Sequence, residues 1–305
     1  WSSDVCSSDL VIEGHGNNLT LNANVVTLAG VVDGAAHAPT SMAGRLTVNA
    51  GQVLLGAGHL DVLGFEQVTL QSLGDVVATA AGGQLQSAGA VAVSASRLAT
   101  LDGSAAALTA GGDLTLRANG RAVSADDLGL GGSWTLQGRN VAIDTLVSAP
   151  SGSIVVQASG AATTGVTVGA GQLDVHGVTR NFGSGHAYTP GGTVVLDGGA
   201  AAVTLGAQSV VNVSAKGADA GSVQVTAAHA QNGAFNMQGQ LLGAADAAAD
   251  SGLARAPLQG SFSLDVGHIE NALAFDTLNA KLNAAGMTES REVRVRQGDV
   301  TLSAS

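Results

Sequence analysis

The stretch between residues 176 and 191 holds the side chains best suited to bind another molecule. Five of them could make such contacts: His176, Arg180, Phe182, His186 and Tyr188. Aromatic rings and polar groups of this kind can stack on a sugar or grip a protein surface. We therefore predict a candidate ligand or adhesion loop here. The alternative is a tolerated surface insertion, because long insertions cost little stability.

Metal-binding and catalytic patterns are not recognisable in the rest of the chain. The seven histidines include no pair three to five residues apart, and Cys6 is the only cysteine, so no zinc site or disulfide is expected. The calcium-binding glycine–aspartate nonapeptide and the Gly-x-Ser-x-Gly elbow are also missing. The glycine-rich run 129–132 lacks the lysine of a phosphate loop, and we interpret it as a corner. The prediction is no catalytic residue, no metal and no cofactor.

Carboxylates are what an enzyme acting on polysaccharides would need, two or three of them on adjacent strands. Asp61 and Asp174 are expected to point outward from strand centres, but they lie far apart in the chain. Asp126, Asp127 and Asp197 are isolated. A polysaccharide lyase or hydrolase therefore stays an alternative without a recognisable site, and we expect a protein that is not an enzyme.

The composition indicates a narrow aliphatic core. Charged residues make up 11% of the chain and aromatic residues 3%, with 44 glycines and 4 prolines. A compact globule of this length normally has more aromatic volume at its centre. The net charge of −11 argues against a nucleic-acid partner. No apolar run is long enough to predict a membrane span.

One short phrase recurs along the chain: glycine, a small or polar residue, then two apolar residues separated by one other residue. Nine copies begin at Gly44, Gly89, Gly112, Gly132, Gly152, Gly192, Gly221, Gly260 and Gly298. Between the first apolar residues at 91, 114, 134 and 154 the steps are 23, 20 and 20 residues. We interpret the step from 154 to 194 as two periods, and the step from 46 to 91 likewise. Such a period is typical of repeat proteins.

The phrase predicts short strands whose apolar residues share one face. Three such strands wound into a coil would turn those faces inward, and glycine would permit the sharp corners. We therefore predict an all-β fold, a right-handed parallel β-helix (solenoid) with coils of roughly 20–23 residues. Apolar residues of the phrase should be buried, namely Leu46, Val48, Leu114, Leu116, Ile154, Val156, Val194, Leu196, Val223 and Val225. The residues between them should face outward: Thr47, Thr115, Val155 and Gln224.

The chain divides into four parts. Residues 1–10, which include Cys6, resemble translated sequencing-adaptor read-through and are predicted to be a non-native leader. Residues 11–226 are predicted to form the β-helix, with the insertion 176–191. Residues 227–259 are predicted to be an Ala/Gly-rich insertion whose stretch 243–250 forms helical turns or a loop. Residues 260–305 are predicted to continue the β-helix, which is cut short.

Several phrases resemble the rod repeats of filamentous haemagglutinin-type exoproteins. They are Gly191–Asp197, Val210–Gly217, Gln259–Val266 and Glu289–Leu302. The resemblance spans residues 11–305 and is strongest after residue 190. It implies an adhesin of Gram-negative bacteria, secreted through an outer-membrane pore partner by the two-partner route. The family's Asn-Pro-Asn-Gly secretion motif is missing, which implies a mid-rod position and export through a domain not present here. Similar repeats occur in autotransporter passengers, an alternative export route.

These observations predict a structural and adhesive rod segment of a large extracellular filament at the bacterial cell surface. Its expected partner is a host-cell or glycan surface. A stalk that displays a C-terminal toxin, as in contact-dependent inhibition, is the second hypothesis. The polysaccharide-active enzyme is the third.

Overall fold

The computed structural model describes residues 11–30, 43–124, 129–159, 163–183, 185–227, 233–270 and 275–297. Strands account for 54% and helix for 4%, so the fold is mostly β, and long parallel sheets dominate it. The leader 1–10, the pair Asp126–Asp127 and the last copy of the phrase, at Gly298, lie outside the described residues. Within the described part, no helix has the length and apolar character needed to cross a bilayer.

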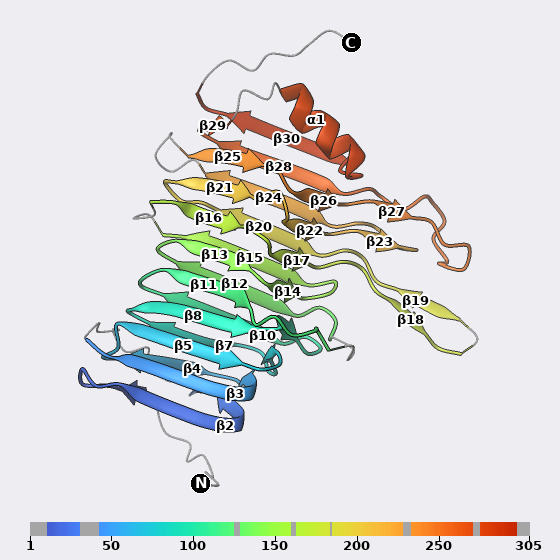
Figure 1. Cartoon of the computed structure of the whole chain (residues 1–305). Helices are drawn as coiled ribbons and strands as arrows, with labels where there is room; N and C mark the ends of the chain where they lie inside the picture. The colour runs from blue at the N-terminus through green and yellow to red at the C-terminus, as the bar shows by residue number, and fades with distance from the viewer. Residues whose placement is uncertain are drawn as a thin grey trace.

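The first long sheet has ten strands, all paired in parallel (Figure 1). In spatial order they are β1 (Val11–Glu13), β4 (His59–Leu63), β7 (Gly83–Ser87), β10 (Ala105–Ala110), β12 (Ser133–Gly138), β15 (Ser153–Ala158), β20 (Thr193–Asp197), β24 (Ser222–Ala227), β28 (Ser261–Val266) and β30 (Ser290–Val295). The spatial order follows the chain order, so each strand adds to the one before it.

The second long sheet has sixteen strands and two wings that meet at β3 (Arg45–Leu55). The long β2 (Leu19–Leu28) pairs with β3 along its length. The wing beyond the first half of β3 contains β5 (Gln67–Ser72), β8 (Ala90–Ala95), β11 (Leu114–Ala118), β13 (Val141–Asp144), β16 (Gly165–Val168), β21 (Ala202–Leu205), β25 (Ala234–Met237) and β29 (His268–Ile269). The wing beyond its second half contains β6 (Val76–Ala78), β9 (Arg97–Thr100), β14 (Leu146–Ser148), β17 (Gln172–Asp174), β22 (Val210–Asn212) and β26 (Gln240–Leu242).

The core lies between the ten-stranded sheet and the two wings of the sixteen-stranded sheet, and it consists of ladders of apolar side chains. All ten apolar residues that the phrase predicts to be buried are no more than 1% exposed. Thr47, Thr115 and Val155 are half-buried and Gln224 is exposed, so the predicted orientation is confirmed. Equivalent residues stack in register, as Leu136, Val156 and Leu196 do. Local alternation of the strand therefore selects the residues that fill the core.

The predicted period holds only in places. We call each step from one strand of a sheet to the next a rung. Leu46, Val68, Val91 and Leu114 are successive partners, so the interval from 46 to 91 is two rungs as predicted. The step from 114 to 134 was interpreted as one period and the step from 154 to 194 as two, and both interpretations were wrong. Leu114 and Trp134 lie in different sheets, and Ile154 pairs directly with Val194, so that interval of 40 residues is one rung.

The irregular rungs arise because segments leave the stack between strands. Residues 119–132 separate β11 from β12, and residues 175–192 separate β17 from β20. The repeated phrase marks a strand, but it carries no information on which sheet the strand joins. Because loop length has a small effect on stability, rungs of unequal length share one core.

Residues 227–259 contain more regular structure than the predicted insertion. β25 and β26 pair with β21 and β22, and β27 (Ala245–Asp246) pairs with β23 (Ala215–Lys216). The described part of this segment thus continues the sheets as far as residue 246. The stretch 243–250 forms no helix, because Ala245 and Asp246 take a place in a parallel ladder.

A helix that the sequence did not predict lies at the C-terminal end of the stack, α1 (Phe275–Ala284). Its Leu278 and Leu282 are buried. The amide of Gly243, just after β26, donates to the Ala285 carbonyl at 2.7 Å. Along the chain, α1 follows β29, whereas β26 follows β25 and β22 follows β21. The helix thus takes the place of a strand in the wing that contains β22 and β26. It therefore covers the end of that wing (Figure 1).

The last rung of the first sheet also differs from the others. In β30, Arg291 occupies the register position above the buried Phe262. Its guanidinium donates to the Asn283 side chain of α1 at 2.7 Å and also to Asn279. A charged residue in the inward ladder disfavours addition of another apolar rung. Residues 260–297 thus continue the ten-stranded sheet, and Arg291 interrupts one of its apolar ladders.

Candidate functional site

The predicted loop 176–191 is an antiparallel hairpin made of β18 (Thr179–Asn181) and β19 (His186–Tyr188). It projects from the long sheets to one side (Figure 1). At its tip, the Phe182 amide donates to the Gly185 carbonyl at 2.9 Å. The Gly183 amide donates to the Asn181 side chain at 3.1 Å, and Gly183 has a φ of 75°, which favours glycine.

The hairpin distributes the five predicted residues over four places. His186 and Tyr188 share one face of β19, with ring centroids 6.0 Å apart. Arg180 lies on the opposite face, because its neighbours in β18 are the partners of Tyr188 and His186. Phe182 stands at the tip and is 70% exposed. His176 remains at the base, so the structure does not bring all five together.

His176 makes a local contact at the base of the hairpin. Its Nδ1 lies 2.7 Å from the Oδ1 of Asp174, at the end of β17. This hydrogen bond raises the pKa of His176 above its ordinary value, and burial only partly opposes it. Because the two residues are only two positions apart, the contact is local to the base of the hairpin.

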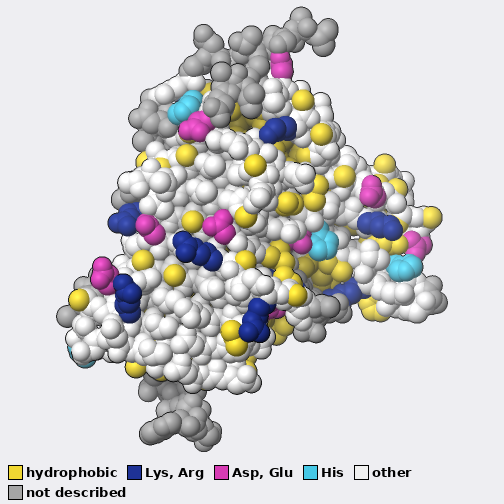
Figure 2. All heavy atoms as spheres, viewed as in Figure 1, with side chains coloured by type: hydrophobic (Ala, Val, Ile, Leu, Met, Phe, Trp, Pro, Cys, Tyr) yellow, Lys and Arg dark blue, Asp and Glu magenta, His cyan; other side chains and the backbone are white. Residues whose placement is uncertain are grey.

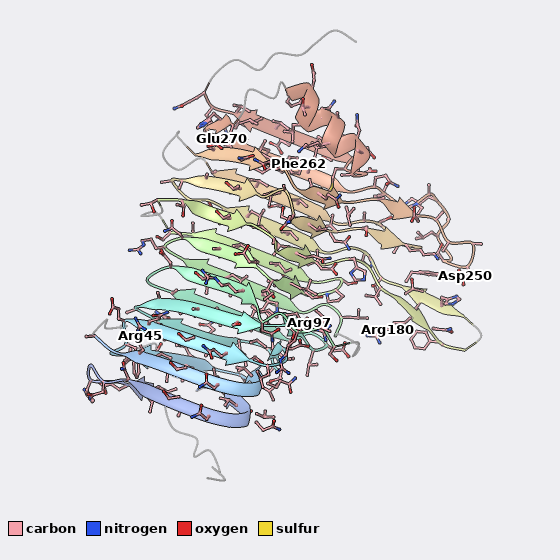
Figure 3. All side chains as sticks on the ribbon, viewed as in Figure 1. Arg45, Arg97, Arg180, Asp250, Phe262 and Glu270 are labelled. Atoms are coloured by element: carbon pink, nitrogen blue, oxygen red, sulfur yellow. The ribbon has the colours of Figure 1, made fainter. Side chains whose placement is uncertain are left out.

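The main contact of the hairpin is with a residue that the sequence did not single out, Asp250. The Tyr188 hydroxyl donates to Asp250 Oδ1 at 2.5 Å, and His186 Nδ1 lies 2.6 Å from Oδ2. Both bonds lower the pKa of Asp250, and the first raises the pKa of Tyr188. Figure 3 shows Asp250 beside the hairpin that carries Arg180. No sequence pattern predicts this contact, because Asp250 lies 62 residues after Tyr188 and 64 residues after His186.

The segment that carries Asp250 is attached at a second point. The two Nη atoms of Arg255 donate to the two carboxylate oxygens of Asp219 at 2.9 and 2.6 Å. The Leu258 amide donates to the same carboxylate at 2.8 Å. These bonds hold the pKa of Asp219 below its ordinary value. Residues 247–258 are thereby held at both ends.

We call the hairpin, residues 176–191, and the segment 247–258 together the lobe. In Figure 2 the lobe stands out from the body of the molecule. Besides Phe182, it exposes Leu253 and Leu258, at 40% and 39%. The lobe thus combines exposed apolar side chains with polar groups that bind one another.

The acids considered for catalysis lie in other places. Asp61 was predicted to point outward, but it is only 3% exposed, and its carboxylate lies 3.2 Å from His59 Nε2. Strand alternation decides only the side on which a residue lies, and neighbouring side chains such as His59 can still cover it. Asp174 belongs to the other long sheet, and Asp197 lies in β20.

The described residues include no group of three or more His, Cys, Asp or Glu side chains placed to hold a metal ion. The glycine-rich run 129–132 lies in the connection between β11 and β12. The Gly129 amide donates to Thr100 and the Gly131 amide to Pro150, both at 3.0 Å. These backbone bonds between rungs are what a corner makes, as the sequence predicted.

The lobe is therefore the candidate site of this chain, because it projects from the sheets and exposes apolar side chains. None of the protein-family models, curated proteins and solved structures compared with the chain matches it.

Proposed function

We propose that the chain is a right-handed parallel β-helix that serves as a structural and adhesive rod segment of a large secreted bacterial surface filament. The observation that carries this proposal is the register of the long sheets, in which successive rungs place equivalent apolar residues above one another. Each rung then depends mainly on its neighbours, as in a quasi-one-dimensional stack. Right-handed winding is proposed because nearly all crossovers between parallel strands have that hand.

A rod built in this way can grow long without a larger core. The ladders are made of small aliphatic residues, and large aromatic residues fill only a few rungs, for example at Trp134. The cross-section therefore stays constant as rungs are added, whereas a globule would need a growing interior. This economy suits a spacer that holds a binding surface away from a cell.

The outer face supports weak and repeated contacts. Thr109, Gln137, Gln157 and Asp197 occupy one outward column and line a shallow hollow of about 330 Å³. The Gln137 amide donates to Gln157 at 2.5 Å, so the side chains form a polar ladder. Such a surface offers many similar contacts, and many weak contacts to a host-cell or glycan surface can add up to firm attachment.

Export through an outer-membrane pore partner completes the proposal. It is supported by the resemblance to filamentous haemagglutinin-type rod repeats and by the low share of charged residues, 11%. A chain stabilised rung by rung can cross a membrane unfolded and assemble outside the cell. The export domain itself would lie outside residues 1–305.

The test has two parts. Electron microscopy of the purified protein should show a short rod, and labelled protein should be retained on cultured host cells or on a glycan array. A compact particle without retention would contradict the proposal. In the genome, a neighbouring pore gene would support secretion by two partners, whereas a terminal nuclease domain would favour the toxin-bearing stalk.

A further inference from the structure

Phe182 is unusual among the phenylalanines that the structure describes. Phe65, Phe235 and Phe262 are at most 2% exposed, whereas Phe182 is 70% exposed. A fully exposed ring gains nothing from the core, because the hydrophobic gain requires removal from water. Single exposed apolar residues are common, so exposure alone does not indicate a binding role, and the position of Phe182 in the fold has to be considered as well.

Phe182 directly follows β18, at the tip of a hairpin that is tied to another segment of the chain. The Phe182 amide donates to the Gly185 carbonyl, and the Asn181 side chain accepts from the Gly183 amide, as described above. The hairpin behind it is fastened to residues 247–258 through Tyr188 and Asp250. A side chain presented next to a fastened hairpin strand loses less conformational entropy on binding than one on a loose loop.

The surroundings of the tip favour a protein over a sugar as partner. Recognition of a sugar needs groups beside the aromatic ring that can hydrogen-bond to the sugar hydroxyls, but three polar side chains of the lobe already have partners in the protein. His186 and Tyr188 hold Asp250, and Arg255 holds Asp219. The lobe instead exposes Leu253, which lies between the two attachment points of its segment.

We infer that the lobe is a docking surface for a protein with an apolar pocket, into which Phe182 inserts as the anchor. Leu253 adds apolar contact, and Asp250 acts from behind as a positioning residue. Interfaces of this kind draw most of their binding energy from a few aromatic anchors in well-packed pockets. The inference rests on the proposed function, because it assumes that the partner protein is on the host-cell surface.

The experiment measures retention of the full 305-residue chain on cultured host cells. Phe182→Ser should reduce retention at least about tenfold, the loss expected for an aromatic anchor. Asp250→Ala should reduce it as well, because the hairpin loses its attachment. The matched control is Leu73→Ser, since Leu73 is 57% exposed but lies outside the lobe. All variants should keep the wild-type circular dichroism.

Cell treatment separates the two kinds of partner. Protease treatment of the cells should abolish the part of retention that depends on Phe182, whereas glycosidase treatment should leave it unchanged. Equal retention of wild type and Phe182→Ser overturns the proposed docking surface but remains compatible with the proposed adhesive function. Loss only after glycosidase treatment overturns the protein partner. If the wild type is not retained at all, both the adhesive function and the docking surface fail.

Discussion

Substitution of two adjacent residues in β15 separates the two faces of the strand. Val156 is 0% exposed and lies in register between Leu136 and Leu196, whereas Val155 points outward and is half-buried. We expect Val156→Lys to destabilise the fold strongly and Val155→Lys to leave it nearly unchanged. The two variants have the same composition and net charge, so each is the control of the other.

The magnitude follows from the charge. An ammonium group without a partner is strongly disfavoured in a dry apolar core, so the buried lysine would lose its proton. Deprotonation at pH 7 of a group whose pKa is about 10.4 costs about 5 kcal/mol, at about 1.4 kcal/mol per pH unit. This is an upper value, because the long side chain can turn toward solvent. The outward substitution should stay within about 0.5 kcal/mol.

The assay is urea unfolding followed by circular dichroism, with the midpoint and slope compared among the three proteins. Because repeat arrays can unfold in parts, the midpoint is the safer quantity. Equal shifts for the two lysine variants would refute the assignment of inward and outward faces. A larger shift for Val155→Lys would refute it as well.

Three further predictions concern single groups. Trp134 is fully buried, and its indole nitrogen has no hydrogen-bond partner among the described residues. Trp134→Phe should therefore change the free energy of unfolding by less than about 1.5 kcal/mol, while Trp134→Ala should cost about 3–5 kcal/mol in the same urea assay. The pKa of His176 is raised in the folded state by Asp174, so its contribution to stability is complete below about pH 6.5 and is lost as the pH rises through the folded-state pKa. Thermal unfolding across this range should show that loss, and Asp174→Asn should flatten it; an unchanged slope would contradict the contact. Arg291→Leu should loosen α1 and promote self-association at the C-terminal end, measured by light scattering, because an apolar rung would replace the charged one. Arg291→Lys, which keeps the charge, should scatter light like the wild type, and equal behaviour of both variants would argue against the charged residue as the barrier.

Within the repeated phrase, the sequence by itself determined which residues form strands and which face the core. The phrase beginning at Gly152 shows this, since Ile154 and Val156 are buried and Val155 is not. This information is local, because side chains of a strand alternate between two faces whatever the strand pairs with. The hairpin segment can also be recognised from the sequence, because it departs from the phrase, and it is one of the segments that leave the stack.

Only the tertiary structure decided where each strand goes. Leu114 and Trp134 carry the same phrase but join different sheets, and Ile154 meets Val194 across 40 residues. Pairing depends on which rung is already in place, and the connection between two rungs can lengthen at little cost. The period of the sequence therefore does not fix the register.

The contacts within the lobe and the helix α1 could not be predicted from the sequence for the same reason. Asp250 sits in an alanine-rich stretch without any pattern, yet it meets Tyr188 because the rungs between them bring the two segments to one side. Asp61 looks like an outward acid and is buried by its neighbours. Alternation is a property of one strand and can be read along the chain, whereas contacts between rungs depend on the whole stack and arise only when it is assembled.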